Sequence, residues 1–309
     1  MNKAVCYFII ALAWMTQSSM AEKKKSVFDD FIDPVSNPVY FEAPTHSTEL
    51  RAIYIHQDIH DNVNTILGSN TPVGGSMQMG ALQLRYAFSE RLSIIATKDG
   101  YAKTKFNNTL TTKDGFADLA LGVKYSPIVD EDNAFILTTG FRVEVPTGDE
   151  NILQGQHSGI ANPFISTGKG FGNLHFLAYQ GLQLPFNTDQ SNIESHTSLH
   201  VDYKLGSFYP LIEFNWQHVL AAGDGGSVKK DTALGELPVG TINNALTGAD
   251  IANLGTAGSE HSNRLNWAFG FRYKVTENLI AGAVYEQEVT SNEVGLFDDR
   301  ITVDVTYKF

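Results

Sequence analysis

The last ten residues of the chain alternate strictly between apolar and polar side chains. Such a period of two places successive side chains on opposite faces of a β-strand. Ten residues of a strand tilted by about 45° rise about 23 Å, close to the roughly 25 Å apolar band of an outer-membrane barrel. A strand of a soluble sandwich can alternate too, but it seldom runs so long. The pattern predicts a membrane-crossing strand, with Ile301, Val303, Val305, Tyr307 and Phe309 facing outward and Arg300, Thr302, Asp304, Thr306 and Lys308 facing inward.

Similar segments recur along the chain and are separated by turn-forming residues. Together they predict an all-β fold, an antiparallel up-and-down transmembrane β-barrel of about 12 strands and of the bacterial outer-membrane type. The predicted strands are residues 47–58, 77–88, 92–98, 116–126, 134–145, 163–170, 174–185, 194–205, 208–219, 261–274, 279–289 and 300–309.

The connections between these strands alternate in length, as they do in bacterial barrels, where periplasmic turns are short and external loops are long. An even number of strands then leaves both termini in the periplasm. The short links are 89–91, 127–133, 171–173, 206–207 and 275–278, and the long ones are 59–76, 99–115, 146–162, 186–193, 220–260 and 290–299.

Aromatic residues gather near the ends of the predicted strands. Rings at this level anchor a barrel in the membrane interface, although a ligand-binding track is the alternative. We expect a lipid-facing girdle near the short turns. A second, looser girdle toward the long loops would hold Phe141, Phe164, Trp216, Trp267 and Tyr285.

The N-terminal region divides the chain into three parts. Residues 1–21 read as a secretory signal peptide, with Lys3 before a short apolar run and a small-x-small cleavage site ending at Ala21. Residues 22–46 contain Pro34, Pro38 and Pro44, which disfavour helix and paired strand. This segment is either a periplasmic lead-in or a plug that enters the lumen through its Val39-Tyr40-Phe41 stretch. Residues 47–309 form the barrel, and the expected location is the bacterial outer membrane.

Charge and cysteine content narrow the possible partners. The chain has 34 acidic and 22 basic residues, a net charge of -12, which argues against nucleic acid. Its single cysteine, Cys6, lies in the predicted signal peptide, so disulfides and thiol chemistry are not expected. The expected partners are outer-membrane lipid and a small-molecule solute, with no cofactor. The C-terminal strand, which ends in Phe309, also resembles the signature that the barrel-assembly machinery is thought to read.

The strand positions that alternate with the outward apolar ones include many acidic and basic residues, so we expect an interior that contains both signs of charge. Buried charges must be paired or hydrated, so the lumen is either a filled salt-bridge network or the lining of a narrow water path. A barrel of twelve strands lies between packed and open ones, and we favour the restricted path. Candidate residues of this path are Arg85, Asp118, Lys124, Arg142, Glu144, His196, His200, Asp202, Glu213, Arg272 and Glu286.

The strand 194–205 is dense in ionisable groups but offers no complete catalytic or metal site. His196 and His200 are about 13 Å apart on a strand, too far to share a metal ion. Ser198 between them is not a nucleophile, base and orienting group by itself. We therefore expect no enzyme and no metal. An outer-membrane hydrolase using Ser198 stays open, as does a structural barrel whose 220–260 loop, with a short helix through Ile242, Leu246 and Ile251, binds a partner.

Two stretches resemble a known family. Asp118-Leu119-Ala120-Leu121-Gly122-Val123-Lys124-Tyr125 and Val145-Pro146-Thr147-Gly148-Asp149, followed by Asn162-Pro163-Phe164, are similar to the outer-membrane barrels of the "MetA pathway of phenol degradation" family. Ala117 stands where the family pattern has glycine. The resemblance covers residues 115–219 well and carries no functional residue across. It implies passive passage of small, aromatic or hydrophobic compounds through an outer-membrane channel or transporter.

Overall fold

The computed structural model describes residues 26–65, 68–149, 152, 158–188, 191–223, 229–232, 235–238, 263–290 and 298–309. The predicted signal peptide and the predicted helix through Ile242, Leu246 and Ile251 lie outside these residues. No helix in the described ranges is long and apolar enough to cross a membrane.

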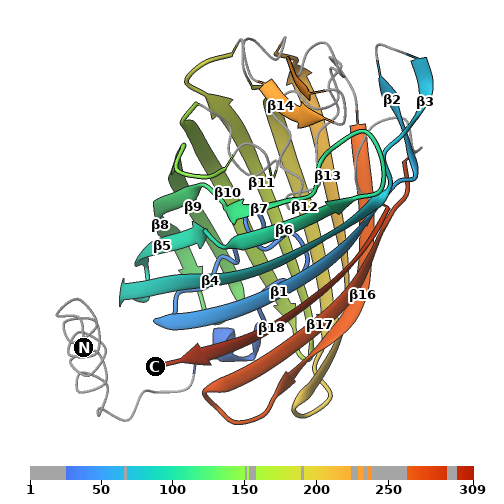
Figure 1. Cartoon of the computed structure of the whole chain (residues 1–309). Coiled ribbons are helices and arrows are strands. Elements are labelled where there is room, and N and C mark those ends of the chain that lie inside the picture. Colours follow the sequence, from blue (N-terminus) through green and yellow to red (C-terminus); the bar gives the residue numbers. More distant parts are fainter. Residues whose placement is uncertain are drawn as a thin grey trace, which may run out of the picture.

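One antiparallel sheet closes into a barrel through the pairing of β1 with β4 (Figure 1). The sheet has 14 strands. Two pairs of them, β5 with β6 and β7 with β8, lie end to end and count as one interrupted wall strand each, so the wall has twelve strands. The predicted closed twelve-stranded barrel is confirmed. The wall strands are β1 (Glu49–Ile59), β4 (Gly75–Ser89), β5 (Leu92–Lys98), β6 (Tyr101–Phe106), β7 (Lys113–Phe116), β8 (Leu119–Asp130), β9 (Phe135–Val145), β10 (Ile160–Phe171), β11 (Leu174–Pro185), β12 (Ile193–Tyr203), β13 (Phe208–Ala221), β16 (Asn263–Lys274), β17 (Leu279–Glu288) and β18 (Asp299–Lys308).

Two small hairpins and one turn of helix complete the described elements. β2 (Asn62–Thr65) with β3 (Gly68–Pro72), and β14 (Lys229–Thr232) with β15 (Gly235–Pro238), belong to long connections. The 3₁₀ helix η1 (Val27–Asp30) precedes the barrel. We call the end of the barrel that carries the links β4–β5, β8–β9, β10–β11, β12–β13 and β16–β17 the short-turn end, and the opposite end the long-loop end.

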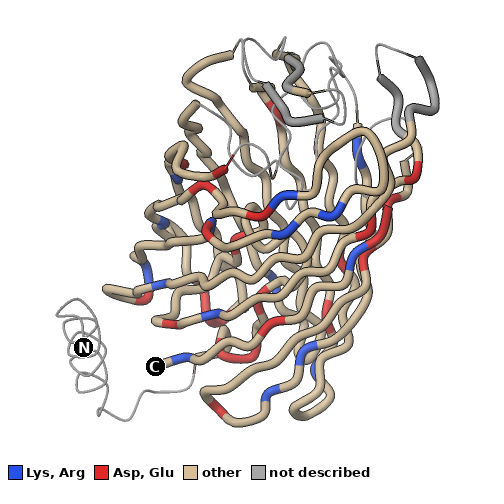
Figure 2. The backbone as a smooth tube through the Cα atoms, in the orientation of Figure 1, with Lys and Arg blue, Asp and Glu red and all other residues tan. Residues whose placement is uncertain are grey.

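Side chains alternate between the two faces of the wall as the period of two requires. In β18, Ile301, Val303 and Val305 are exposed, whereas Thr302 and Asp304 are buried. Charged positions recur throughout the wall (Figure 2). In β18 the buried charged residues Arg300 and Asp304 lie on the face opposite the exposed apolar residues. The barrel is therefore apolar outside and polar inside.

The wall is taller at one side than the sequence predicts. Residues 99–115 are not simply a loop, because β6 and β7 continue the wall beyond β5 and β8. The apolar alternation is missing here, since Lys103 and Lys105 take outward, exposed positions and the inward residues Ala102 and Thr104 are small. Backbone pairing with β4 still extends the strand.

Phe164 does not belong to an outward girdle. In β10 it shares the inward parity of Asn162 and Ser166 and is only 5 % exposed. Its ring stacks on Tyr179 at 5.6 Å, and the guanidinium of Arg142 lies 5.1 Å from its centroid. The prediction of a lipid-facing Phe164 is therefore wrong.

Candidate functional site: the lumen and a break in its wall

Residues 31–44, which we call the inner segment, are all buried. They follow η1 at the short-turn end and run inside the barrel, where the blue trace lies behind β1 and β4 (Figure 1). Tyr40 and Phe41 belong to one apolar cluster with Phe164, Leu177 and Tyr179 of the wall. A second cluster joins Ile32 and Val35 to wall residues that include Tyr209 and Leu211.

Glu42, one of the two acidic residues of the inner segment, is neutralised by two wall cations. Glu42 accepts hydrogen bonds from Arg85 Nη2 at 2.7 Å and from Lys124 Nζ at 2.6 Å, and all three side chains are buried. Burial favours the protonated carboxyl, but the charges of Arg85 and Lys124 outweigh it and lower the pKa of Glu42 well below its ordinary value. Glu42 therefore stays ionised inside the lumen.

The backbone of the inner segment is held by wall side chains because it forms no helix or strand that would satisfy its own polar groups. Arg272 donates to the carbonyl oxygens of Asp33 and Pro34. Glu213 accepts from the amides of Val35 and Ser36, at 2.9 and 2.7 Å. Further along the segment, Arg142 donates to the carbonyl oxygens of Val39 and Tyr40.

A buried histidine strengthens this hold on the amides. His200 places Nδ1 2.7 Å from Glu213 Oε1 and Nε2 3.0 Å from Asp202 Oδ2. An ionised carboxylate only accepts hydrogen bonds, and a neutral imidazole donates from one nitrogen only. With both carboxylates ionised, His200 carries a proton on each nitrogen and stands as a cation between them. His175 continues the row, with Nδ1 2.8 Å from Asp202 Oδ1.

His46 fixes the point where the inner segment turns into β1. Ser93 Oγ lies 2.6 Å from its Nδ1 and Ser126 Oγ 2.6 Å from its Nε2. Ser126 is also 2.6 Å from Thr138 Oγ1, which donates to the carbonyl of Pro44. Burial lowers the pKa of His46 to about 3, so the ring is neutral and completes an ordered chain of hydrogen bonds. Both serine side chains are fully buried, which makes this an anchor and not a catalytic pair.

The predicted pathway residues fall into two groups, although every one of them is buried. Arg85, Lys124, Arg142, His196, His200, Glu213 and Arg272 contact the inner segment by hydrogen bond or ring packing. Asp118 instead accepts a hydrogen bond from Gly148 in the connection after β9, and Glu144, Asp202 and Glu286 interact with other wall residues. That they line a path for solute stays a prediction.

Several residues of the site were missed by the sequence reasoning. Arg51, Gln83 and Gln183 also hold the inner segment, through Pro34, Pro38 and Tyr40. Lys98 pairs with Glu144, and Arg264 is a buried charge of the wall. Arg51, Gln83, Gln183 and Arg264 share the inward parity of their strands, so applying the alternation to every strand position would have found them. Lys98 breaks the alternation, because it follows the inward Thr97 at a shift in register.

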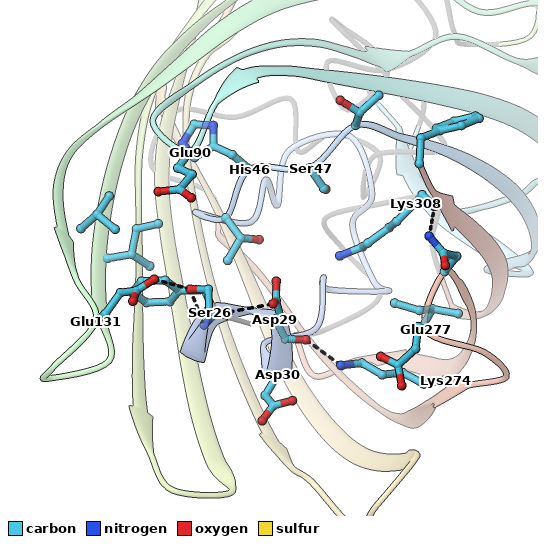
Figure 3. Close-up of a pocket in the computed structure, with 18 residues that line it drawn as sticks. Ser26, Asp29, Asp30, His46, Ser47, Glu90, Glu131, Lys274, Glu277 and Lys308 are labelled. Carbon is cyan, nitrogen blue, oxygen red and sulfur yellow. Dashed lines mark hydrogen bonds between the residues drawn. The ribbon is translucent and has the colours of Figure 1, made fainter. Parts of the chain in front are cut away.

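A cavity of about 450 Å³ opens beneath the inner segment at the short-turn end (Figure 3). Around it, Ser26 donates to Glu131, Lys274 donates to the backbone of Asp29, and Lys204 pairs with Asp30 at 2.6 Å. These contacts are partly exposed, unlike the buried contacts deeper in the barrel. The entrance of the segment is thus held more loosely than its middle.

The two family-like stretches meet where the wall is interrupted. Pairing between β5 and β8 ends at Lys98 and Ala120, and pairing between β6 and β7 begins at Tyr101 and Phe116. Gly148 donates its amide to the buried Asp118, and the amide of Leu119 donates to Thr147. A Cβ on Gly148 would come within 2.5 Å of the Asp118 amide nitrogen, so the motif requires glycine at this point.

Glycine is also required on the other side of this break. Gly100 has φ +123°, and a Cβ there would lie 2.7 Å from the methyl group of Met79. Its carbonyl accepts the amide of Ala117 at 2.9 Å, which bridges the two interrupted strands. The wall is therefore held together here by single contacts instead of a continuous ladder.

A groove of about 700 Å³ occupies the break. Most of its lining is apolar, and Leu82, Tyr101, Phe116 and Leu119 are exposed on the outer face. Ala117 and Ala81 also belong to a buried apolar cluster on the luminal side of the same strands, with Ile53, Ile55, Met77, Met79, Ala102 and Phe106. Apolar side chains thus continue from the lumen to the outer surface.

Ser198, the residue of the alternative hydrolase hypothesis, is buried on β12. Ser198 donates to Asn215 Oδ1 at 2.7 Å. The described ranges contain no group of three or more histidine, cysteine or acidic residues that could hold a metal ion.

Solved structures share this fold. The COG4313 outer membrane channel from Pseudomonas putida F1 superposes with a TM-score of 0.62 at 12 % identity, covering 90 % of this chain and 100 % of the other. The NanC porin gives a TM-score of 0.50 at 11 % identity, covering 85 % of this chain and 100 % of the other. No family model matches the chain, and no curated protein matches it either. The fold is that of outer-membrane β-barrels.

Proposed function

We propose that this chain is an outer-membrane channel that carries small apolar or aromatic molecules from the long-loop end of its lumen through the groove in its wall. The single observation that carries the proposal is the continuity of apolar residues between the luminal cluster and the groove, through Ala81 and Ala117. Apolar side chains in a lumen otherwise lined by charge favour solutes with an apolar part over wholly polar ones.

The inner segment favours a sideways exit. It fills the part of the lumen next to the short-turn end with buried apolar and paired charged groups, so a straight route is blocked there. The exposed apolar outer face, which includes Leu121, Leu199 and Val303, suits a surrounding lipid phase that would receive an apolar solute. An apolar solute leaving through the groove would then partition directly into that lipid.

Two likenesses agree with the proposal. The Pseudomonas putida structure with this fold is described as an outer membrane channel. The sequence stretches around Asp118 and Gly148, which resemble the phenol-degradation family, are the residues that build the wall break.

Filling the groove tests the proposal. A Cβ at Gly80 meets no atom within 4 Å, so Gly80→Trp places an indole in the groove without a backbone clash. We expect a severalfold loss of radiolabelled toluene uptake by Gram-negative cells that express this variant. Val123→Trp, on an exposed outer position away from the groove, is the matched control and should take up toluene like the wild type. Unchanged uptake in Gly80→Trp, or uptake that does not depend on the protein, would refute the proposed route.

A further inference from the structure

The part of the lumen toward the long-loop end has two unlike walls. One is the apolar cluster on β1, β4 and β6 described above. The other is polar, and its side chains are buried on β1, β13, β16, β17 and β18. We call these residues the polar wall: Gln57, Gln217, Arg264, Asn266, Glu286 and Arg300.

Strand registers bring the two walls side by side. Arg300 pairs with Gln57 across β18 and β1, and Gln57 pairs with Met77 across β1 and β4. Met77 is a fully buried member of the apolar cluster. A solute in this part of the lumen therefore meets apolar and polar groups at one level of the barrel.

Arg264 differs from the other described luminal arginines. It is 1 % exposed, and none of its three guanidinium nitrogens has a hydrogen-bond partner. By contrast, Arg51, Arg85, Arg142, Arg272 and Arg300 each donate to a carboxylate, an amide oxygen or a backbone carbonyl. A guanidinium offers five N–H donors, and leaving them unsatisfied inside a protein is costly.

The nearest acid does not satisfy this guanidinium. Glu288 Oε1 lies 3.6 Å from Arg264 Nε, beyond a good hydrogen bond. The two oxygens of Glu288 are already engaged, Oε2 at 3.1 Å from His60 and Oε1 at 2.6 Å from Thr290. Gln217, directly across the β13–β16 pair from Arg264, and Asn266 each have an unpartnered amide oxygen. Donors and acceptors without partners thus lie beside the apolar wall.

We propose that Arg264 binds the carboxylate of an amphipathic organic acid, while the apolar part of that acid lies against Met77 and its neighbours. A planar guanidinium matches a carboxylate with two parallel hydrogen bonds, and a charge-assisted pair of this kind is strong when water is excluded. The inference rests on the proposed function, because it names the class of solute that the channel holds before the wall groove.

A matched pair of probes tests this site. 4-Phenylbutyrate is ionised at neutral pH, and 4-phenylbutanol has the same apolar part without the charge. Isothermal titration with the full chain in lipid nanodiscs measures both, with empty nanodiscs subtracted. Arg264→Gln should weaken 4-phenylbutyrate binding about tenfold and leave 4-phenylbutanol binding nearly unchanged. Arg91→Gln, the same change at the exposed short-turn end, is the control and should alter neither.

Three results would overturn the site: no binding of 4-phenylbutyrate to the wild type, equal binding to Arg264→Gln, or an equal loss for both probes. Circular dichroism melting verifies that each variant is folded. This binding test can fail or succeed independently of the proposed route, because the route is tested by toluene uptake in Gly80→Trp. If the groove variant takes up toluene normally while 4-phenylbutyrate still needs Arg264, the sideways route fails and the carboxylate site stands.

Discussion

The two ends of the lumen use the same kind of residue in opposite ways. Near the short-turn end, Arg85, Lys124 and Arg272 are hydrogen-bonded to the inner segment, which acts as a built-in occupant. Near the long-loop end, Arg264 is equally buried and has no hydrogen bond. A charged residue that faces the lumen can therefore be hydrogen-bonded within the protein, or it can keep donors that a bound solute could satisfy. Only the surrounding residues distinguish the two cases.

Breaking the buried triad should have the largest effect. Glu42→Gln leaves Arg85 and Lys124 without their common carboxylate, and removing one partner of a buried ion pair costs about 3–5 kcal/mol. The free energy of unfolding in urea, measured in micelles, gives this loss.

The exposed end of the same segment supplies the control. Asp30→Asn removes the Lys204 pair, whose side chains are about a quarter exposed, and should cost no more than about 1 kcal/mol. Equal losses in Glu42→Gln and Asp30→Asn would show that the inner segment is not held in a buried site.

Acid should loosen the same region by a smaller amount. The pKa of His46 is lowered from 6.5 to about 3, so its neutral ring contributes fully above pH 6.5 and progressively less as the pH falls toward 3. Glu42 has a lowered pKa as well, and its contribution is lost below its ordinary value of 4.5. We expect the free energy of unfolding to decrease as the pH is lowered through this window. His46→Gln should reduce the slope between pH 6.5 and 4.5, where Glu42 does not titrate. If His46→Gln showed the same pH dependence of the unfolding free energy as the wild type, other groups would cause the loss of stability in acid.

The smallest effect is expected at the other end of the lumen. Arg264→Met replaces a buried charge that makes no hydrogen bond by an apolar side chain of similar length, so stability should change by less than about 1 kcal/mol or increase. Arg142→Met removes the hydrogen bonds to the carbonyl oxygens of Val39 and Tyr40, so it should destabilise the protein clearly more. Thermal melts of the two variants side by side measure the difference, and a larger loss in Arg264→Met would reverse the comparison.

The alternation in the sequence was sufficient to predict the barrel because a period of two assigns each side chain to a face. It failed locally where that pattern weakens. Lys103 and Lys105 conceal β6, and Phe164 is predicted on the wrong face because it is apolar and its apolar neighbour Ile165 takes the outward position. Where two successive residues are both apolar, the alternation alone does not decide which of them faces outward.

Partners inside the lumen could not be predicted in the same way. Parity places Arg85 and Lys124 inside but says nothing about Glu42, which lies far away in sequence and outside any strand. The prolines of residues 22–46 excluded regular structure without choosing between a lead-in and a plug. Arg264 could have been found, since it has the parity of Arg272 on the same strand. That its guanidinium makes no hydrogen bond is visible only in three dimensions.

Ion conductance in planar bilayers tests most directly the claim that the inner segment closes the lumen. The full chain and a variant lacking residues 22–44 are compared after circular dichroism has shown that both are folded barrels. Without the inner segment, the charged groups of the short-turn half can hydrate and the lumen is continuous, so we predict a severalfold higher conductance. Equal conductance of the two folded proteins would contradict the account.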